Sequence, residues 1–141
     1  VAWAKSSGKT LFNLMEEMYM EHGFYLEDLI SITKQGRSGQ KEISEKMSDL
    51  RKNPPKTIVD EEVLRVIDYL ESEQTGLPKS NVLQFITNKG TKVTARPSGT
   101  EPKIKYYFSV KERLSSKSEY LSIKQRLTKK IAKIQAEMNL K

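Results

Sequence analysis

Residues 96–102, with the sequence RPSGTEP, bring together side chains that suit anion binding. Arg96 can hold an oxyanion through two parallel hydrogen bonds. Ser98 and Thr100 each offer a hydroxyl donor, and Gly99 removes the Cβ that would obstruct a tight turn around the anion. A proline at each shoulder stiffens the segment and lowers the entropy lost on binding. These donors suit a phosphate dianion, whereas the alternative is a tight turn whose hydroxyls bond to their own backbone.

Other kinds of catalytic chemistry are poorly supplied. The 141 residues include no Cys, which excludes a disulfide scaffold, cysteine zinc sites and thiol catalysis. They include one His, His22. The acidic residues at 60–62 have no partner ligands at metal spacing. Ser6 to Thr10 end like a nucleotide-binding loop, but Trp3 stands where that motif needs glycine. We therefore predict no catalytic residue and no metal site within this chain.

The net charge of +7 belongs to the C-terminal quarter. Residues 103–141 carry 11 basic and 3 acidic side chains, whereas residues 1–102 carry 14 and 15. A basic surface of this kind can attract nucleic acid, an anionic membrane or a phosphorylated metabolite, or can simply be a solvated helix face. No apolar run approaches the ~20 residues of a membrane span, and the start lacks both Met and a signal-peptide pattern. We expect a piece of a longer cytoplasmic protein.

The spacing of apolar residues predicts the elements that carry the loop. Helical spacing predicts three helices, over residues 9–22, over residues 39–52 after a turn or hinge at 36–39, and from a capping box at Ser116 and Glu119 onward. Strands are predicted over 24–33, 81–87, 92–96 and 103–110, the last with one buried face because its apolar residues alternate. Residues 58–72 fit both a helix and a strand.

The segment ARPSGTEPKIKYYF, residues 95–108, closely resembles the phosphate-binding loop and following strand of the α-D-phosphohexomutases, the phosphoglucomutase and phosphomannomutase family. The resemblance extends to LPKSNVLQF at 77–85, to GFYLEDLISIT at 23–33 and to GKTLFNLMEEMY at 8–19. It therefore covers most of the chain.

The resemblance implies a fold. Residues 1–36 would be the tail of a preceding α/β domain with its hinge, and residues 37–141 a C-terminal phosphate-binding domain. That domain would be α+β, with a four-stranded, mainly antiparallel sheet and helices packed on one face, as in the TATA-box-binding protein. The helix and extended segment of the preceding domain would come before it. The family fold also favours a strand within 62–71.

The resemblance also implies a function. Members of the family move a phosphoryl group between the 1 and 6 positions of a hexose phosphate, with Mg²⁺ at a donor serine. The C-terminal loop grips the phosphate that is not transferred, and Arg96, Ser98, Gly99 and Thr100 match its contacts. The expected partners are a hexose phosphate and the upstream domains, with no membrane. The donor-serine, magnesium and sugar-specificity motifs do not occur here, so the chain alone should be inactive. A basic nucleic-acid-binding module is the alternative.

Overall fold

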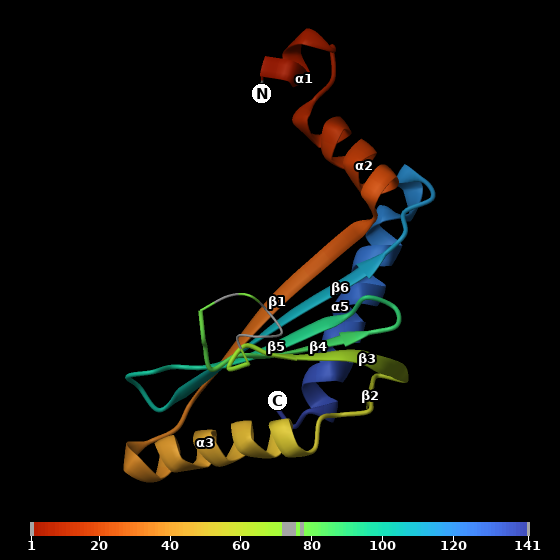
Figure 1. Ribbon diagram of the computed structural model, residues 1–141. Coiled ribbons are helices and arrows are strands. Elements are labelled where there is room, and N and C mark those ends of the chain that lie inside the picture. The colour runs from red at the N-terminus through yellow and green to blue at the C-terminus, as the bar shows by residue number, and fades with distance from the viewer. Residues whose placement is uncertain (1, 72–75, 77, 141) are drawn as a thin grey trace.

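Six strands form one antiparallel sheet in the computed structural model, which describes residues 2–71, 76 and 78–140. The strand order is β1-β6-β5-β4-β3-β2, and every neighbouring pair is antiparallel (Figure 1). In chain order the elements are α1 (Ala2–Ser6), α2 (Leu11–His22), β1 (Phe24–Thr33), α3 (Gly36–Lys52), β2 (Thr57–Ile58), β3 (Glu61–Asp68), β4 (Leu83–Thr87), β5 (Lys92–Pro97), β6 (Lys103–Glu112), the 3₁₀ helix η1 (Lys117–Glu119) and α5 (Tyr120–Glu137).

The predicted α+β class is confirmed, but the sheet has six strands where four were predicted. The first addition is β1, which pairs with β6 over ten residues, from Phe24 opposite Glu112 to Thr33 opposite Lys103. The second is the two-residue strand β2. The extended segment expected from a preceding domain is thus an edge strand of this sheet. The division of the chain at residue 36 stays a prediction.

Local predictions had mixed outcomes. The ambiguous stretch at 58–72 contains the strand β3, as the family fold favours. The turn predicted at 36–39 is wrong, because these residues form the first turn of α3. The predicted capping box is also absent. Ser116 makes no capping hydrogen bond, while Glu119 Oε2 accepts one from Ser115 N at 3.2 Å. A short 3₁₀ turn therefore leads into α5.

The core lies between one face of the sheet and the helices α3 and α5. The alternate residues of β6, from Ile104 to Val110, are at most 4% exposed. They pack with an apolar stripe on α5 and with the buried side of α3. The helix residues involved are Ile43, Met47, Ile123, Leu127, Ile131 and Ile134. This packing leaves the other residues of β6 for the open face of the sheet.

A buried carboxylate joins β3, the β4–β5 hairpin and α5. Glu61 is 3% exposed, and its Oε1 lies 2.5 Å from Lys130 Nζ. Its Oε2 accepts hydrogen bonds from the hydroxyls of Thr87 (2.8 Å) and Thr91 (2.7 Å). Burial alone would raise the pKa of Glu61, but these hydrogen bonds outweigh it and hold the pKa below its ordinary value. Glu61 therefore has a structural role, since it links the β4–β5 hairpin to α5.

The N-terminal helices α1 and α2 project away from the sheet (Figure 1). The C-terminal end of α2 contacts the rest of the protein through an aromatic cluster. The ring centroid of Tyr19 lies 4.9 Å from that of Phe24 and 6.1 Å from that of Tyr120. Leu14 is buried, whereas Met15 and Met18 are exposed. The apolar stripe predicted for this helix is therefore only partly covered. Within the described residues, no helix is long and apolar enough to cross a membrane.

Candidate phosphate-binding site

The loop between β5 and β6 is closed by short backbone hydrogen bonds. Ser98 N donates to Lys103 O at 2.7 Å, and Lys103 N donates to Glu101 O at 2.8 Å. A third bond, from Lys34 N to Pro102 O at 2.8 Å, fastens the loop to the chain between β1 and α3. The loop is thus closed by two bonds of its own and held at Pro102 by the segment that follows β1.

The Ser98 hydroxyl lies inside the turn. Its Oγ accepts long hydrogen bonds from Thr100 N (3.4 Å) and Glu101 N (3.3 Å). This is the arrangement of the alternative reading, in which a turn hydroxyl satisfies its own backbone. Because Ser98 only accepts in these bonds, its hydroxyl proton stays available to an acceptor outside the turn.

Two cations stand side by side next to the loop. The register places Arg96 of β5 directly opposite Lys105 of β6, with both on the open face of the sheet. Directly opposed side chains have Cβ atoms about 5 Å apart, and like charges at that distance repel each other. Lys103 lies two residues before Lys105 on the same face, since side chains alternate along a strand. An anion between these groups would relieve their repulsion.

These side chains border a hollow of about 240 Å³. Arg96, Ser98 and Gly99 line it, together with Glu101 and Lys103. Of the four predicted site residues, Thr100 is exposed and lies outside this lining. The charged side chains of the hollow are Arg96, Lys103, Lys105 and Glu101. Their net charge is about two positive units.

The role predicted for Gly99, which is to leave room for an anion at the turn, stays a prediction. Its backbone does not adopt a positive φ, and an added Cβ would meet no atom within 4 Å. The turn itself therefore does not require glycine at this position. What a side chain at Gly99 would affect is the free space of the hollow that this residue lines.

Lys103, Lys105 and Tyr107 also line the hollow, and the sequence analysis did not select them. They follow the loop as alternate residues of β6, opposite in direction to the buried Ile104 and Tyr106. The alternation in KIKYYF was the available signal. The same alternation that predicts the buried face of this strand also places these three residues together on the other face.

Among the residues that the structure describes, no metal centre lies near this hollow. The described residues contain no group of three or more His, Asp or Glu side chains that could hold a metal ion. His22 is exposed at the end of α2, and its Nε2 lies 3.7 Å from the neighbouring Glu21 carboxylate. What the arrangement can do chemically is bind and orient an anion.

Curated phosphoglucomutases are similar in sequence to this chain. No family model matches the chain. A phosphoglucomutase of Staphylococcus aureus is 40% identical over 117 residues, and a phosphoglucomutase of Staphylococcus haemolyticus is 36% identical over 116 residues. These matches cover 76% and 75% of this chain and 21% of each relative, in the relatives' C-terminal region.

A solved structure of a Paramecium phosphoglucomutase, the exocytosis-sensitive phosphoprotein parafusin in its open form, is also similar. Its TM-score is 0.49 at 13% identity, and the alignment covers 90% of this chain and 23% of that one. The chain therefore spans about a fifth of the length of the curated relatives it matches.

Proposed function

We propose that this chain, related over three quarters of its length to the C-terminal region of phosphoglucomutases, is the phosphate-binding part of a phosphohexomutase. The parent enzyme would transfer a phosphoryl group between the 1 and 6 positions of a hexose phosphate. The loop at 96–102 would hold the phosphate that stays in place. The observation that carries this proposal is the pair Arg96 and Lys105, directly opposite each other beside the Ser98 hydroxyl.

Charge and donor geometry favour a phosphate monoester over other anions. The guanidinium of Arg96 supplies two parallel donors, and Lys103 and Lys105 supply point charges. With Glu101 opposed to three cations, the hollow matches the two negative charges of a phosphate ester. Ser98 and Gly99 line the same space. Thr100 follows Gly99 in the chain and would add a hydroxyl from outside this lining.

The function of such a grip is positional. Binding energy from a phosphate that does not react can hold the reacting end of the sugar against its partner group. A loop held by three backbone hydrogen bonds reorganises little on binding, so more of that energy is available for orientation. The loop residues would act as binding residues, and none of them would be catalytic.

The remaining chemistry would belong to other parts of the parent enzyme. We infer that the donor serine, the Mg²⁺ that assists it and the sugar-selecting residues lie outside this chain. The described residues include no group of His, Asp or Glu side chains that could hold this ion. The chain alone should bind a hexose phosphate without converting it.

The distribution of positive charge supports this proposal over nucleic-acid binding. Lys103 and Lys105 border the hollow, while Arg126 pairs with Glu112 and Lys130 with Glu61. These four are among the eleven basic residues of the C-terminal quarter, and their placement leaves fewer cations for a continuous phosphate-binding stripe.

The test is an NMR titration of the ¹⁵N-labelled chain with glucose 6-phosphate. We expect a Kd on the order of 1 mM, equal to about −4 kcal/mol, with amide shifts confined to residues 96–105. Arg96→Gln should weaken binding at least tenfold, because a charge-assisted contact contributes about 1.5–3 kcal/mol. Arg113→Gln makes the same change just beyond the far end of β6, roughly 30 Å from the loop, and should bind like wild type.

Two results would contradict the proposal. One is an unchanged loop in the presence of about 20 mM ligand, well above the expected Kd. The other is an equal loss of affinity in the Arg96→Gln and Arg113→Gln variants, which would indicate general charge attraction. Affinity for DNA that falls steeply with salt would favour the nucleic-acid alternative.

A further inference from the structure

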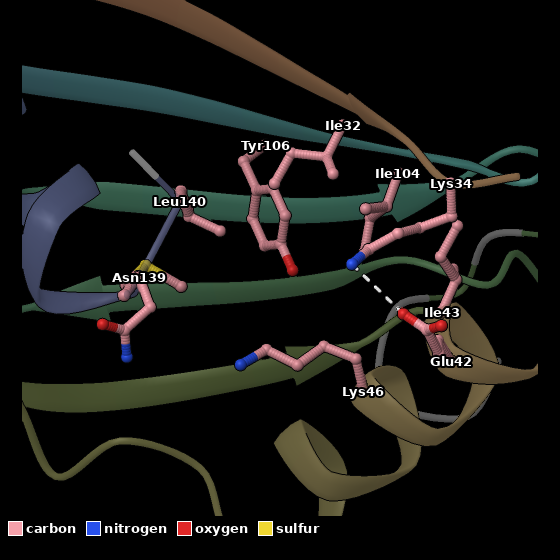
Figure 2. A pocket seen from close by; sticks show the side chains of 10 residues that line it. Ile32, Lys34, Glu42, Ile43, Lys46, Ile104, Tyr106, Asn139 and Leu140 are labelled. Carbon is pink, nitrogen blue, oxygen red and sulfur yellow. Dashed lines mark ion pairs between the residues drawn. The ribbon is translucent and has the colours of Figure 1, made fainter. Parts of the chain in front are cut away.

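A second cavity lies on the helix-covered side of the sheet, behind the loop. Its volume is about 390 Å³, at the lower end of the range for small-molecule pockets. It is a half-open hollow bordered by the end of β1, the first half of α3, the start of β6 and the turn after α5 (Figure 2). None of the residues proposed to bind phosphate lines it. The two hollows are therefore lined by separate sets of residues.

One side of this cavity is apolar and held in place. It consists of Ile32, Ile43, Ile104, Met138 and Leu140. Ile43 and Ile104 are 7% and 4% exposed and belong to the core. The C-terminal wall is fixed because Leu140 N donates to Gln135 O at 2.8 Å and Asn139 takes a positive φ of 55°. A preformed apolar chamber of this kind favours a ligand with a hydrocarbon part.

Polar groups gather at one side of the chamber. Figure 2 shows the Tyr106 hydroxyl and the ammonium groups of Lys34 and Lys46 pointing into the same space. Lys34 Nζ lies 3.1 Å from the Glu42 carboxylate, whereas Lys46 has no ion pair with any residue in the described ranges. These three charged side chains leave a net charge of one positive unit. The polar side is thus suited to a single negative charge.

Tyr106 supplies a neutral donor to this space. The residue is 1% exposed, and its hydroxyl forms no hydrogen bond with the described residues. That oxygen is open to the cavity, because the described residues include no fully buried side-chain polar atom without a partner. Burial raises the pKa of this hydroxyl above its ordinary value, so it keeps its proton at neutral pH. A buried tyrosine hydroxyl that opens into a cavity ordinarily finds a partner there.

We propose that this cavity binds a small amphipathic monocarboxylate, whose hydrocarbon part packs against Ile43 and Leu140 and whose carboxylate bonds to Lys46 and Tyr106. The single positive charge favours a carboxylate here, while the doubly positive loop favours a phosphate ester. A ligand on the order of eight carbons matches the volume. This inference is independent of the proposed function, because the two hollows lie on opposite faces of β6.

The test is a titration of the ¹⁵N-labelled chain with octanoate, with 1-octanol and acetate as ligands that lack the charge or the hydrocarbon part. Octanoate should shift the amides of Ile32, Ile43, Ile104 and Asn139 with a Kd on the order of 1 mM, and should leave residues 98–101 unchanged. Octanol and acetate should each bind at least about tenfold more weakly. Inorganic phosphate, added separately, reports on the loop alone.

Two variants separate the head-group contacts from general effects. Lys46→Gln should weaken octanoate binding roughly tenfold, and Tyr106→Phe a few-fold, because each removes a contact to the carboxylate. Lys41→Gln removes an equal charge from the same helix at a side chain that is 78% exposed, and should leave the affinity unchanged. The inference is overturned if the cavity amides do not respond at about 10 mM octanoate, if octanol binds equally well, or if the response is confined to the loop.

Discussion

Lys130→Met is the substitution that tests the buried network of Glu61 most directly. It removes the ammonium group that lies 2.5 Å from Glu61 Oε1 and keeps most of the aliphatic stem. The Lys130 side chain is 18% exposed, so the stem is largely packed in the wild type. After the change, the Glu61 carboxylate keeps two threonine hydroxyls but has no counter-ion.

The expected cost follows from the burial of the partner that remains. Removing one member of a buried ion pair costs about 3–5 kcal/mol, and the two threonine bonds place this case near 3 kcal/mol. With an m-value of about 1.5 kcal/mol/M, the urea midpoint falls by about 2 M. Glu61→Gln should cost less, about 1 kcal/mol, because the remaining ammonium can extend toward water. The order of the two losses is therefore part of the prediction.

Urea unfolding followed by circular dichroism measures both variants. Lys129→Met, at the exposed neighbouring position, is the matched control and should change stability by less than about 0.5 kcal/mol. The low pKa of Glu61 stabilises the fold above the unfolded value of about 4.3, and this contribution is lost as the pH falls through the folded pKa. The gap between wild type and Lys130→Met should therefore be present from pH 7 down to about pH 4.3 and should shrink as the pH falls further. A gap that equals the Lys129→Met control, or that does not change with pH, would refute the reasoning.

Three further substitutions test other parts of the fold by the same measurement. Arg51→Met removes the half-buried hydrogen bond from Nε to Asp68 Oδ2 (2.7 Å) and should lower the free energy of unfolding by about 1–2 kcal/mol at pH 7. The loss should be smaller once acid protonates Asp68, and an equal loss at both pH values would contradict the ion-pair account. Gly90→Ala should cost about 1 kcal/mol, since φ is +79° and a Cβ would lie 2.3 Å from the end of the Lys111 side chain; a neutral result would mean that the turn rearranges freely. Leu127→Ala should cost about 3 kcal/mol in the core, whereas Leu121→Ala, 69% exposed in the same helix, should cost little; similar losses would place the core elsewhere.

Short-range patterns predicted most of the elements. The alternation from Ile104 to Val110 identified β6 and its buried face, because a period of two has one structural meaning on a half-buried strand. The stripe that includes Ile123 and Leu127 likewise identified α5 and its packing side.

What the sequence left open concerns partners that lie far apart along the chain. The pairing of β1 with β6 joins residues about 80 positions apart, and no local pattern reports such a contact. The placement of Arg96 opposite Lys105 was missed for another reason, because it depends on the register of two consecutive strands. The helical first turn at Gly36 was missed because two glycines in four residues favour a turn locally, while packing of α3 against the sheet overrides that preference. The hydrogen bonds of Ser98 Oγ to the backbone of its own turn match the alternative that the sequence left open beside anion binding.

The two faces of β6 impose different constraints on neighbouring positions. Ile104 and Tyr106 border the apolar chamber, and Lys103 and Lys105 border the loop hollow on the other side. A saturation mutagenesis profile of this strand would then show two interleaved sets, one tolerant only of bulky apolar residues and one that keeps its basic side chains only under selection for phosphate binding. Selection for folding alone would erase the second set and preserve the first.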